Sequence, residues 1–219
     1  MESNANTDRR TFLAAMGAVS VAGTGIGQTV SLSDGPTVRR SAGPTSKWDM
    51  SWLDGLKGKH KQVFDVASVS TALHAVMNYL DAFEEIYSLR SPQVNTVVGI
   101  AGKGFAYNAT DRLWAAYKLG EKYNVKDPDT GTWSVRNIFY DKANSNETVK
   151  ALQARGSIFW MCNNALNRLS KQWSEEAMKS PEDVKKDLLA GLNPGVIVVP
   201  AHTMLLGLCQ ERGCTYQMV

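Results

Sequence analysis

The stretch that decides the fold reads Gly-Ser-Ile-Phe-Trp-Met-Cys-Asn-Asn-Ala-Leu, residues 156–166. Its unbroken apolar run, 158–161, is typical of a strand that is buried on both faces. A helical pattern follows at once, and Cys162 stands at the junction between the two. A buried strand that leads directly into a helix is the repeating unit of a parallel α/β sheet, so this junction predicts that fold class.

The same alternation of apolar runs and helical patterns continues on both sides of the junction. The apolar runs predict strands at 63–68, 94–100, 196–199 and 214–219. The helical patterns predict helices at 71–87, 110–123, 146–155 and 203–212, and a further one after Cys162 with Leu166, Leu169, Trp173 and Ala177 on one face. Ser180-Pro181 supplies the cap and first-turn proline of one more. We therefore predict a three-layer α/β/α domain over 47–219 with a mostly parallel five-stranded sheet, interrupted by a polar, turn-rich insertion at 124–144.

Composition excludes some classes of partner. The chain has 219 residues, of which 43% are hydrophobic and 21% charged, as expected for one globular domain with an appended segment. Its net charge of +3 is small, and its Lys and Arg residues are interleaved with acidic ones, so we expect no nucleic-acid partner. No apolar run is long enough to cross a membrane, so we expect no membrane span.

The appended segment resembles an export signal. Residues 8–13 read Asp-Arg-Arg-Thr-Phe-Leu, and a weakly apolar stretch follows at 14–27, in the manner of a twin-arginine signal. Asp8 stands where Ser or Thr is usual, and there is no clear Ala-x-Ala cleavage site, so a flexible basic tail is the alternative. We predict a signal peptide at 1–30, a linker at 31–46 and a periplasmic location.

Cys162 is the candidate functional residue. The first N–H groups of a helix and its positive end stabilise a thiolate, which is the reactive form of cysteine. His202 follows the next strand, and ligand sites in parallel sheets lie where the strands end, so we predict that the two side chains are neighbours and that the imidazole activates the thiol. The alternatives are a small buried cysteine and a polar residue at a helix start.

A second group of residues is predicted to bind a ligand at the same edge of the sheet. Gly102 and Lys103 follow the second strand in a loop that can hold an anion, Asn163 and Asn164 follow Cys162, and His74 lies near the start of the first helix. The glycines at 99, 102 and 104 are in the wrong order for a dinucleotide site, and no Cys or His spacing suggests zinc. We expect neither a cofactor nor a metal.

Several of these segments resemble one family. Residues 189–201 read Leu-Ala-Gly-Leu-Asn-Pro-Gly-Val-Ile-Val-Val-Pro-Ala, and 205–216 continue as Leu-Leu-Gly-Leu-Cys-Gln-Glu-Arg-Gly-Cys-Thr-Tyr. Together with the strand, cysteine and helix at 159–166, this order is similar to the DsrE-like sulfur-relay family of the DsrE, DsrF and YchN type. Residues 48–65 and 127–140 resemble an exported subgroup of that family.

The resemblance implies a parallel α/β fold, a homo-oligomer such as a trimer or hexamer, and a cysteine that carries sulfane sulfur. That cysteine corresponds to Cys162, while Cys209 and Cys214 correspond to core positions. His202 stands where the family commonly has a small residue, so the pairing of Cys162 with His202 is an inference from this sequence alone. Two functions are expected: an exported protein that binds or transfers sulfane sulfur through Cys162, or a non-catalytic oligomeric module that binds a small molecule or a partner.

Overall fold

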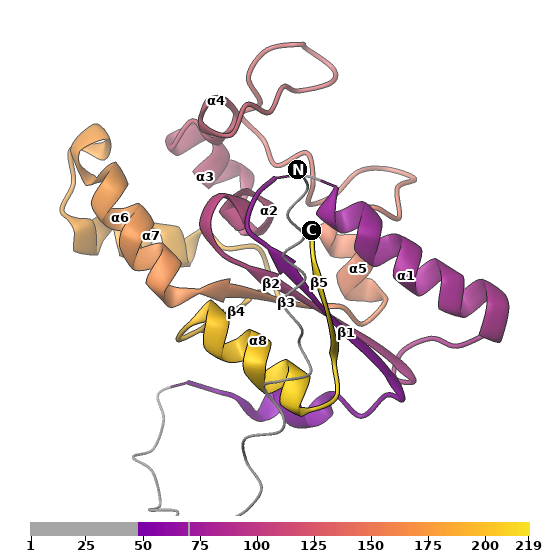
Figure 1. Cartoon of the computed structure of the whole chain (residues 1–219). Coiled ribbons are helices and arrows are strands. Elements are labelled where there is room, and N and C mark those ends of the chain that lie inside the picture. Colours follow the sequence, from indigo (N-terminus) through magenta and orange to yellow (C-terminus); the bar gives the residue numbers. More distant parts are fainter. Residues whose placement is uncertain (1–47, 70) are drawn as a thin grey trace, which may run out of the picture. The chain divides into compact units, whose positions relative to one another are not determined.

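Five parallel strands form one sheet in the order β4-β3-β2-β1-β5 (Figure 1). The computed structural model describes residues 48–69 and 71–219, so the predicted signal peptide and linker lie outside the described residues. The strands are β1 His60–Val66, β2 Val94–Ile100, β3 Ile158–Cys162, β4 Ile197–Val199 and β5 Thr215–Met218. The prediction of a five-stranded α/β sheet is confirmed, and every pairing in it is parallel.

Helices connect the strands and flank the sheet. They are η1 Ser51–Gly55, α1 Ala72–Tyr87, η2 Gly102–Gly104, α2 Phe105–Asn108, α3 Asp111–Ala116, α4 Leu119–Lys122, α5 Val149–Ala154, α6 Asn163–Ala177, α7 Pro181–Ala190 and α8 His202–Glu211. Ser180 caps α7 as predicted, because its hydroxyl accepts the N–H of Asp183 at 3.1 Å. Among the described residues, no helix is both long and apolar enough to cross a membrane.

Alternate strand residues serve two separate cores. Phe64 and Phe159 join the larger core with residues of α1, α5 and α6, whereas Val63 and Trp160 join a smaller core with residues of α8 and η1. Successive side chains of a strand point to opposite faces, so β1 and β3 are covered by helices on both faces, whereas β5 at the edge of the sheet is exposed. Figure 1 shows α8 on one side of the strands and α1 with α5 on the other.

Two predicted helices differ from the structure for local reasons. The predicted helix 110–123 is divided into α3 and α4, because Lys118 adopts a left-handed conformation with φ of 50° that interrupts it. The predicted helix 146–155 begins only at Val149, because the Thr148 hydroxyl accepts the N–H of Ala151 at 3.1 Å and so caps it. The short helix α2 was not predicted. These differences leave the order of strands along the chain unchanged.

The insertion is irregular, as predicted, and is tied to the domain by hydrogen bonds. Within it, the Arg136 guanidinium is paired with Asp127 and Asp129, and it holds the pKa of Asp127 at about 2. The Asn137 side chain donates to the Ala109 carbonyl at 2.6 Å, and the Asn137 N–H donates to an Asp111 carboxylate oxygen at 2.7 Å. These bonds connect the insertion to α2 and α3, and they provide hydrogen-bond partners for backbone groups, such as the Ala109 carbonyl, that would otherwise bond to water.

Candidate thiol site

The Cys162 sulfur lies at the N-termini of two helices. Cys162 ends β3 and is the N-cap residue of α6, and its Sγ accepts the N–H of Ala165 at 3.4 Å. The N–H of His202, the first residue of α8, donates to the same Sγ at 3.3 Å. The first N–H groups of a helix have no partner within the helix, and here both helices direct one of them at the same sulfur atom.

Strand pairing brings the second helix to this sulfur. Cys162 on β3 pairs with Val199 on β4, so the two strands end side by side. After β4 the chain bends at Pro200 and is extended again at Ala201, the N-cap residue of α8. Helix α8 then packs on the smaller core. Because parallel neighbours end at the same edge, Cys162 at the end of β3 lies beside the start of α8 after β4, as the sequence predicted.

The His202 side chain is held by Asp65 and Trp160 rather than by the thiol. Its Nε2 lies 2.7 Å from an Asp65 carboxylate oxygen, and its Nδ1 accepts the Trp160 indole N–H at 3.1 Å. An indole nitrogen only donates, so Nδ1 is unprotonated and Nε2 carries the proton that points to Asp65. The other Asp65 oxygen accepts the Tyr216 hydroxyl at 2.7 Å, and this bond raises the pKa of Tyr216.

Gly99 makes room for this arrangement. Trp160 is fully buried on the α8 side of the sheet, and its ring lies against Gly99 of the neighbouring strand β2. A Cβ atom at Gly99 would lie 2.3 Å from Cζ2 of the indole, which is far inside contact distance. A glycine is therefore required for the Trp160 ring to occupy its place beside His202.

The structure brings Cys162 and His202 together, but through the His202 backbone. Both ring nitrogens of His202 already have partners, and the bond to Sγ comes from the main-chain N–H. The sequence analysis missed Asp65, Trp160 and Tyr216. The one available signal was Asp65 itself, a charged residue within the apolar run of β1.

The other predicted ligand-binding residues are distributed over the domain. Asn163 and Asn164 form the first turn of α6, directly after Cys162. Gly102 and Lys103 lie in η2, just after β2. His74 is different, because its Nδ1 pairs with Glu147 at 3.1 Å in an ion pair that is about half exposed. The residues after β2 and β3 therefore share one edge of the sheet, whereas His74 belongs to a surface contact of α1.

The remaining two cysteines form a separate pair. All three cysteines are free thiols, and Cys209 near the C-terminal end of α8 forms a hydrogen bond with Cys214. That bond, followed by Lys61 and Arg212, lowers the pKa of Cys214, and the same bond together with burial raises the pKa of Cys209. Among the described residues, no three His, Cys, Asp or Glu side chains gather in a way that could hold a metal ion.

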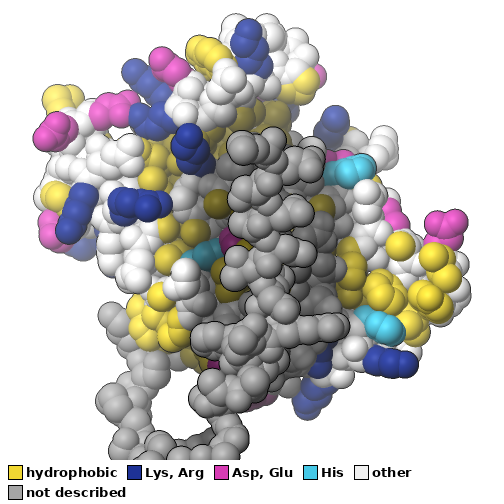
Figure 2. Space-filling model, viewed as in Figure 1, with side chains coloured by type: hydrophobic (Ala, Val, Ile, Leu, Met, Phe, Trp, Pro, Cys, Tyr) yellow, Lys and Arg dark blue, Asp and Glu magenta, His cyan; other side chains and the backbone are white. Residues whose placement is uncertain are grey.

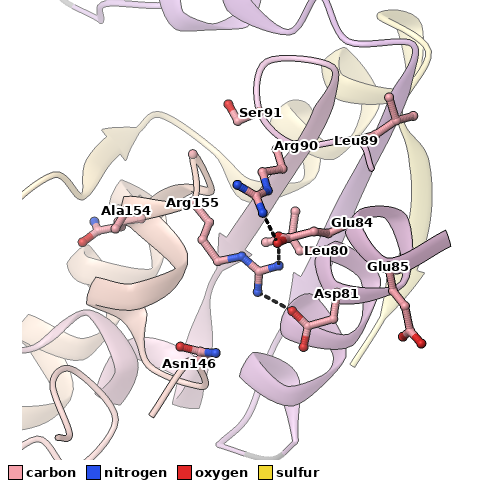
Figure 3. A pocket seen from close by; sticks show the side chains of 12 residues that line it. Leu80, Asp81, Glu84, Glu85, Leu89, Arg90, Ser91, Asn146, Ala154 and Arg155 are labelled. Carbon is pink, nitrogen blue, oxygen red and sulfur yellow. Dashed lines mark hydrogen bonds and ion pairs between the residues drawn. The ribbon is translucent and has the colours of Figure 1, made fainter. Parts of the chain in front are cut away.

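One cavity, of about 860 Å³, lies at the opposite edge of the sheet (Figure 3). It is lined by Ser91 and Gly156, which precede β2 and β3, and by charged residues of α1. Arg155 pairs with Asp81 at 2.7 Å, and Arg90 pairs with Glu84 at 2.5 Å. Because these opposite charges are paired with one another, we interpret the lining of this cavity as an ion-pair network and not as a ligand site.

Comparison with known proteins adds little to this geometry. No family model matches the chain, and no curated protein matches it. Among solved structures, it is similar to a protein of unknown function, MTH1491 from Methanobacterium thermoautotrophicum, with 15% identity and a TM-score of 0.38 over 73% of this chain and 99% of that one. At that TM-score the likeness supports no conclusion about the fold or the chemistry of this chain.

Proposed function

We propose that Cys162 accepts and carries sulfane sulfur. The observation that carries the proposal is the pair of N–H bonds to its Sγ, one from the N-terminus of α6 and one from that of α8. A persulfide keeps its negative charge on sulfur, and backbone N–H groups at helix N-termini are suited to stabilise such a charge. The resemblance of 159–166 to the DsrE-like strand, cysteine and helix element assigns the sulfur to the same residue.

The step is a thiol exchange with a polysulfide. Cys162 loses its proton to solvent, and its thiolate attacks the terminal sulfur of the polysulfide. A bond forms between Sγ and that sulfur, the adjacent S–S bond of the polysulfide breaks, and the shortened polysulfide leaves with the electron pair. The transferred sulfur oxidises the cysteine to a persulfide, and the polysulfide is reduced by the same two electrons.

Two features of the site assign roles to its residues. Cys162 is only 5% exposed, which favours a small sulfur species over a protein thiol as the donor. His202 acts as a positioning residue, because Asp65 and Trp160 hold its ring and thereby keep its main-chain N–H directed at Sγ. The imidazole itself takes no part in the transfer, since both of its nitrogens are engaged.

Mass spectrometry of the folded protein after incubation with polysulfide tests the proposal. We expect the variant that lacks the other two thiols, Cys209→Ala with Cys214→Ala, to gain one sulfur atom, about 32 Da, at Cys162. The further change Cys162→Ser should abolish that gain. A gain that appears only after denaturation would contradict the proposal and would favour the second function expected from the sequence.

That second function is a non-catalytic oligomeric binding module with a buried cysteine. Its supporting observation is the same low exposure of Cys162. In this case Cys162 serves only as the cap of α6, and Cys162→Ser would keep the capping bond to the Ala165 N–H without loss of function. Retention of a ligand by Cys162→Ser, together with no sulfur uptake by the parent protein, distinguishes it.

A further inference from the structure

A second cavity, about 370 Å³, lies beside α6 at the edge of the sheet where β2 and β3 end. Its lining comes from three separate parts of the chain: Lys103 of η2, Tyr123 at the end of α4, and Arg168, Leu169 and Trp173 of α6. A volume of this size is at the lower end of the range for small-molecule sites, about 300–1,000 Å³. The cavity is therefore large enough for a compact organic ligand.

The charge of the lining is positive. Lys122 is ion-paired with Glu176 and lies over the Trp173 ring at 5.7 Å. Arg168 and Lys103 are both exposed, and neither has an ion-pair partner among the described residues. Figure 2 shows Lys and Arg side chains gathered over α3, α4 and α6, the face to which this lining belongs. Two unpaired cations at one cavity favour an anion.

A buried hydroxyl provides an independent indication of a ligand. The Tyr123 Oη is shielded from solvent and has no hydrogen-bond partner among the described residues. Burial raises the pKa of Tyr123, so the hydroxyl keeps its proton and remains a donor. A buried polar group without a partner costs free energy, and a ligand atom that accepts from it would remove that cost.

We propose that this cavity binds a small aromatic acid. Its anionic end lies between Arg168 and Lys103 and accepts from Tyr123, while its ring packs against Leu169 and the small part of Trp173 that borders the cavity. A guanidinium binds a carboxylate through two parallel N–H bonds, and apolar side chains in the wall of a cavity bind a flat apolar body. The site needs no contribution from Cys162, so this proposal stands apart from the proposed sulfur chemistry.

Calorimetric titration of the full chain with naphthalene-2-carboxylate tests this proposal. We expect binding that Arg168→Gln weakens by about tenfold, Lys103→Gln by several-fold and Tyr123→Phe by about threefold. Lys57→Gln, which removes one positive charge from the exposed segment between η1 and β1, should leave the affinity unchanged. Thermal melting checks that each variant is folded.

Two further ligands and one further variant complete the experiment. Naphthalene-2-carboxamide, which lacks the charge, should bind much more weakly, and so should inorganic sulfate, which lacks the ring. Equal binding of either ligand, or equal affinity of Arg168→Gln and the parent protein, would overturn the proposal. Cys162→Ser should bind the acid like the parent protein, so failure of the sulfur chemistry and failure of this site are separately visible.

Discussion

The two places where this protein holds thiols differ in what surrounds the sulfur. Cys162 accepts hydrogen bonds from the backbone of two helices at their N-termini. The thiols of Cys209 and Cys214 form a hydrogen bond with each other near the C-terminal end of α8, and Lys61 and Arg212 are their charged neighbours. Exposure does not separate the sites, because Cys162 is 5% and Cys214 is 6% exposed. The two sites differ in the groups that form hydrogen bonds with the sulfur.

This difference predicts different fates for an added sulfur atom. A persulfide at Cys162 has no hydrogen-bonded thiol beside it among the described residues, so it remains until another molecule removes it. A persulfide at Cys214 has the Cys209 thiol as a neighbour, which can attack Cys214 and release hydrosulfide. We therefore predict that Cys162 carries the added sulfur, whereas Cys209 and Cys214 form a disulfide.

The largest expected effect is a change of product. In Cys162→Ser, polysulfide should produce no persulfide but a loss of two hydrogens, about 2 Da, as Cys209 and Cys214 join and hydrosulfide leaves. Intact mass and peptide mapping under non-reducing conditions measure both products. A stable persulfide on Cys214 in this variant would contradict the prediction that the two sites give different products.

A substitution at Gly99, which packs against Trp160 on the neighbouring strand, should lower the stability of the folded protein. Gly99→Ala places a Cβ within 2.3 Å of the Trp160 ring, which must move away from His202, so we expect a loss of about 1–3 kcal/mol in the free energy of unfolding. Urea denaturation measures the loss. Gly55→Ala is the control, because a Cβ there meets nothing within 4 Å. Equal stability of the two variants would show that the Trp160 contact does not constrain the site.

The main-chain N–H of His202 can be removed without removing α8. His202→Pro lacks this donor, and proline is well tolerated at the first position of a helix after an extended residue such as Ala201. His202→Ala loses the imidazole but keeps the N–H. We expect Cys162 to react with iodoacetamide several-fold more slowly in His202→Pro than in His202→Ala, in a background without the other two cysteines.

Equal rates for the two His202 variants, both far below the parent rate, would assign the activation of Cys162 to the imidazole, as the sequence first suggested. Far-ultraviolet circular dichroism and thermal melting check that α8 and the fold persist in both.

The smallest effect concerns the paired thiols. The Cys209 S–H stabilises the thiolate form of Cys214, so Cys209→Ala should raise the pKa of Cys214 and move its alkylation to higher pH. Cys209→Ser keeps a donor and should retain more of the lowered pKa. The pH dependence of alkylation in a Cys162→Ser background measures both shifts. An unchanged pKa of Cys214 in Cys209→Ala would show that Lys61 and Arg212 dominate instead.

Local sequence was sufficient for the elements that define the fold. The apolar run at 94–100 corresponds residue for residue to β2, and Ser180-Pro181 begins α7 as predicted. These features depend on neighbours along the chain: burial on both faces of a strand, and a cap with a proline in the first turn. The break at Lys118 was not visible, because an ordinary residue there adopts a left-handed conformation that its type does not favour.

The positions of Cys162 and His202 in the candidate site could be predicted in the same way. The sequence placed Cys162 between a strand and a helix, and parallel pairing then placed His202 near it. The bonds of the His202 ring were not predictable, because Asp65, Trp160 and Tyr216 come from three strands and meet only through the order and register of the sheet. The same holds for Arg168, which faces the cavity beside Lys103 across 65 residues of chain that include β3.

The sequence by itself determined the alternation of strands and helices and the position of the thiol at a helix start, because hydrophobic periodicity and capping act between residues close in the chain. Only the tertiary structure decided which groups bond to that thiol. It placed β4 beside β3 and so directed the main-chain N–H of α8 at Sγ, while the His202 side chain turned to Asp65 and Trp160. Hydrogen bonds of this kind depend on the register between strands distant in the chain, which no local pattern encodes.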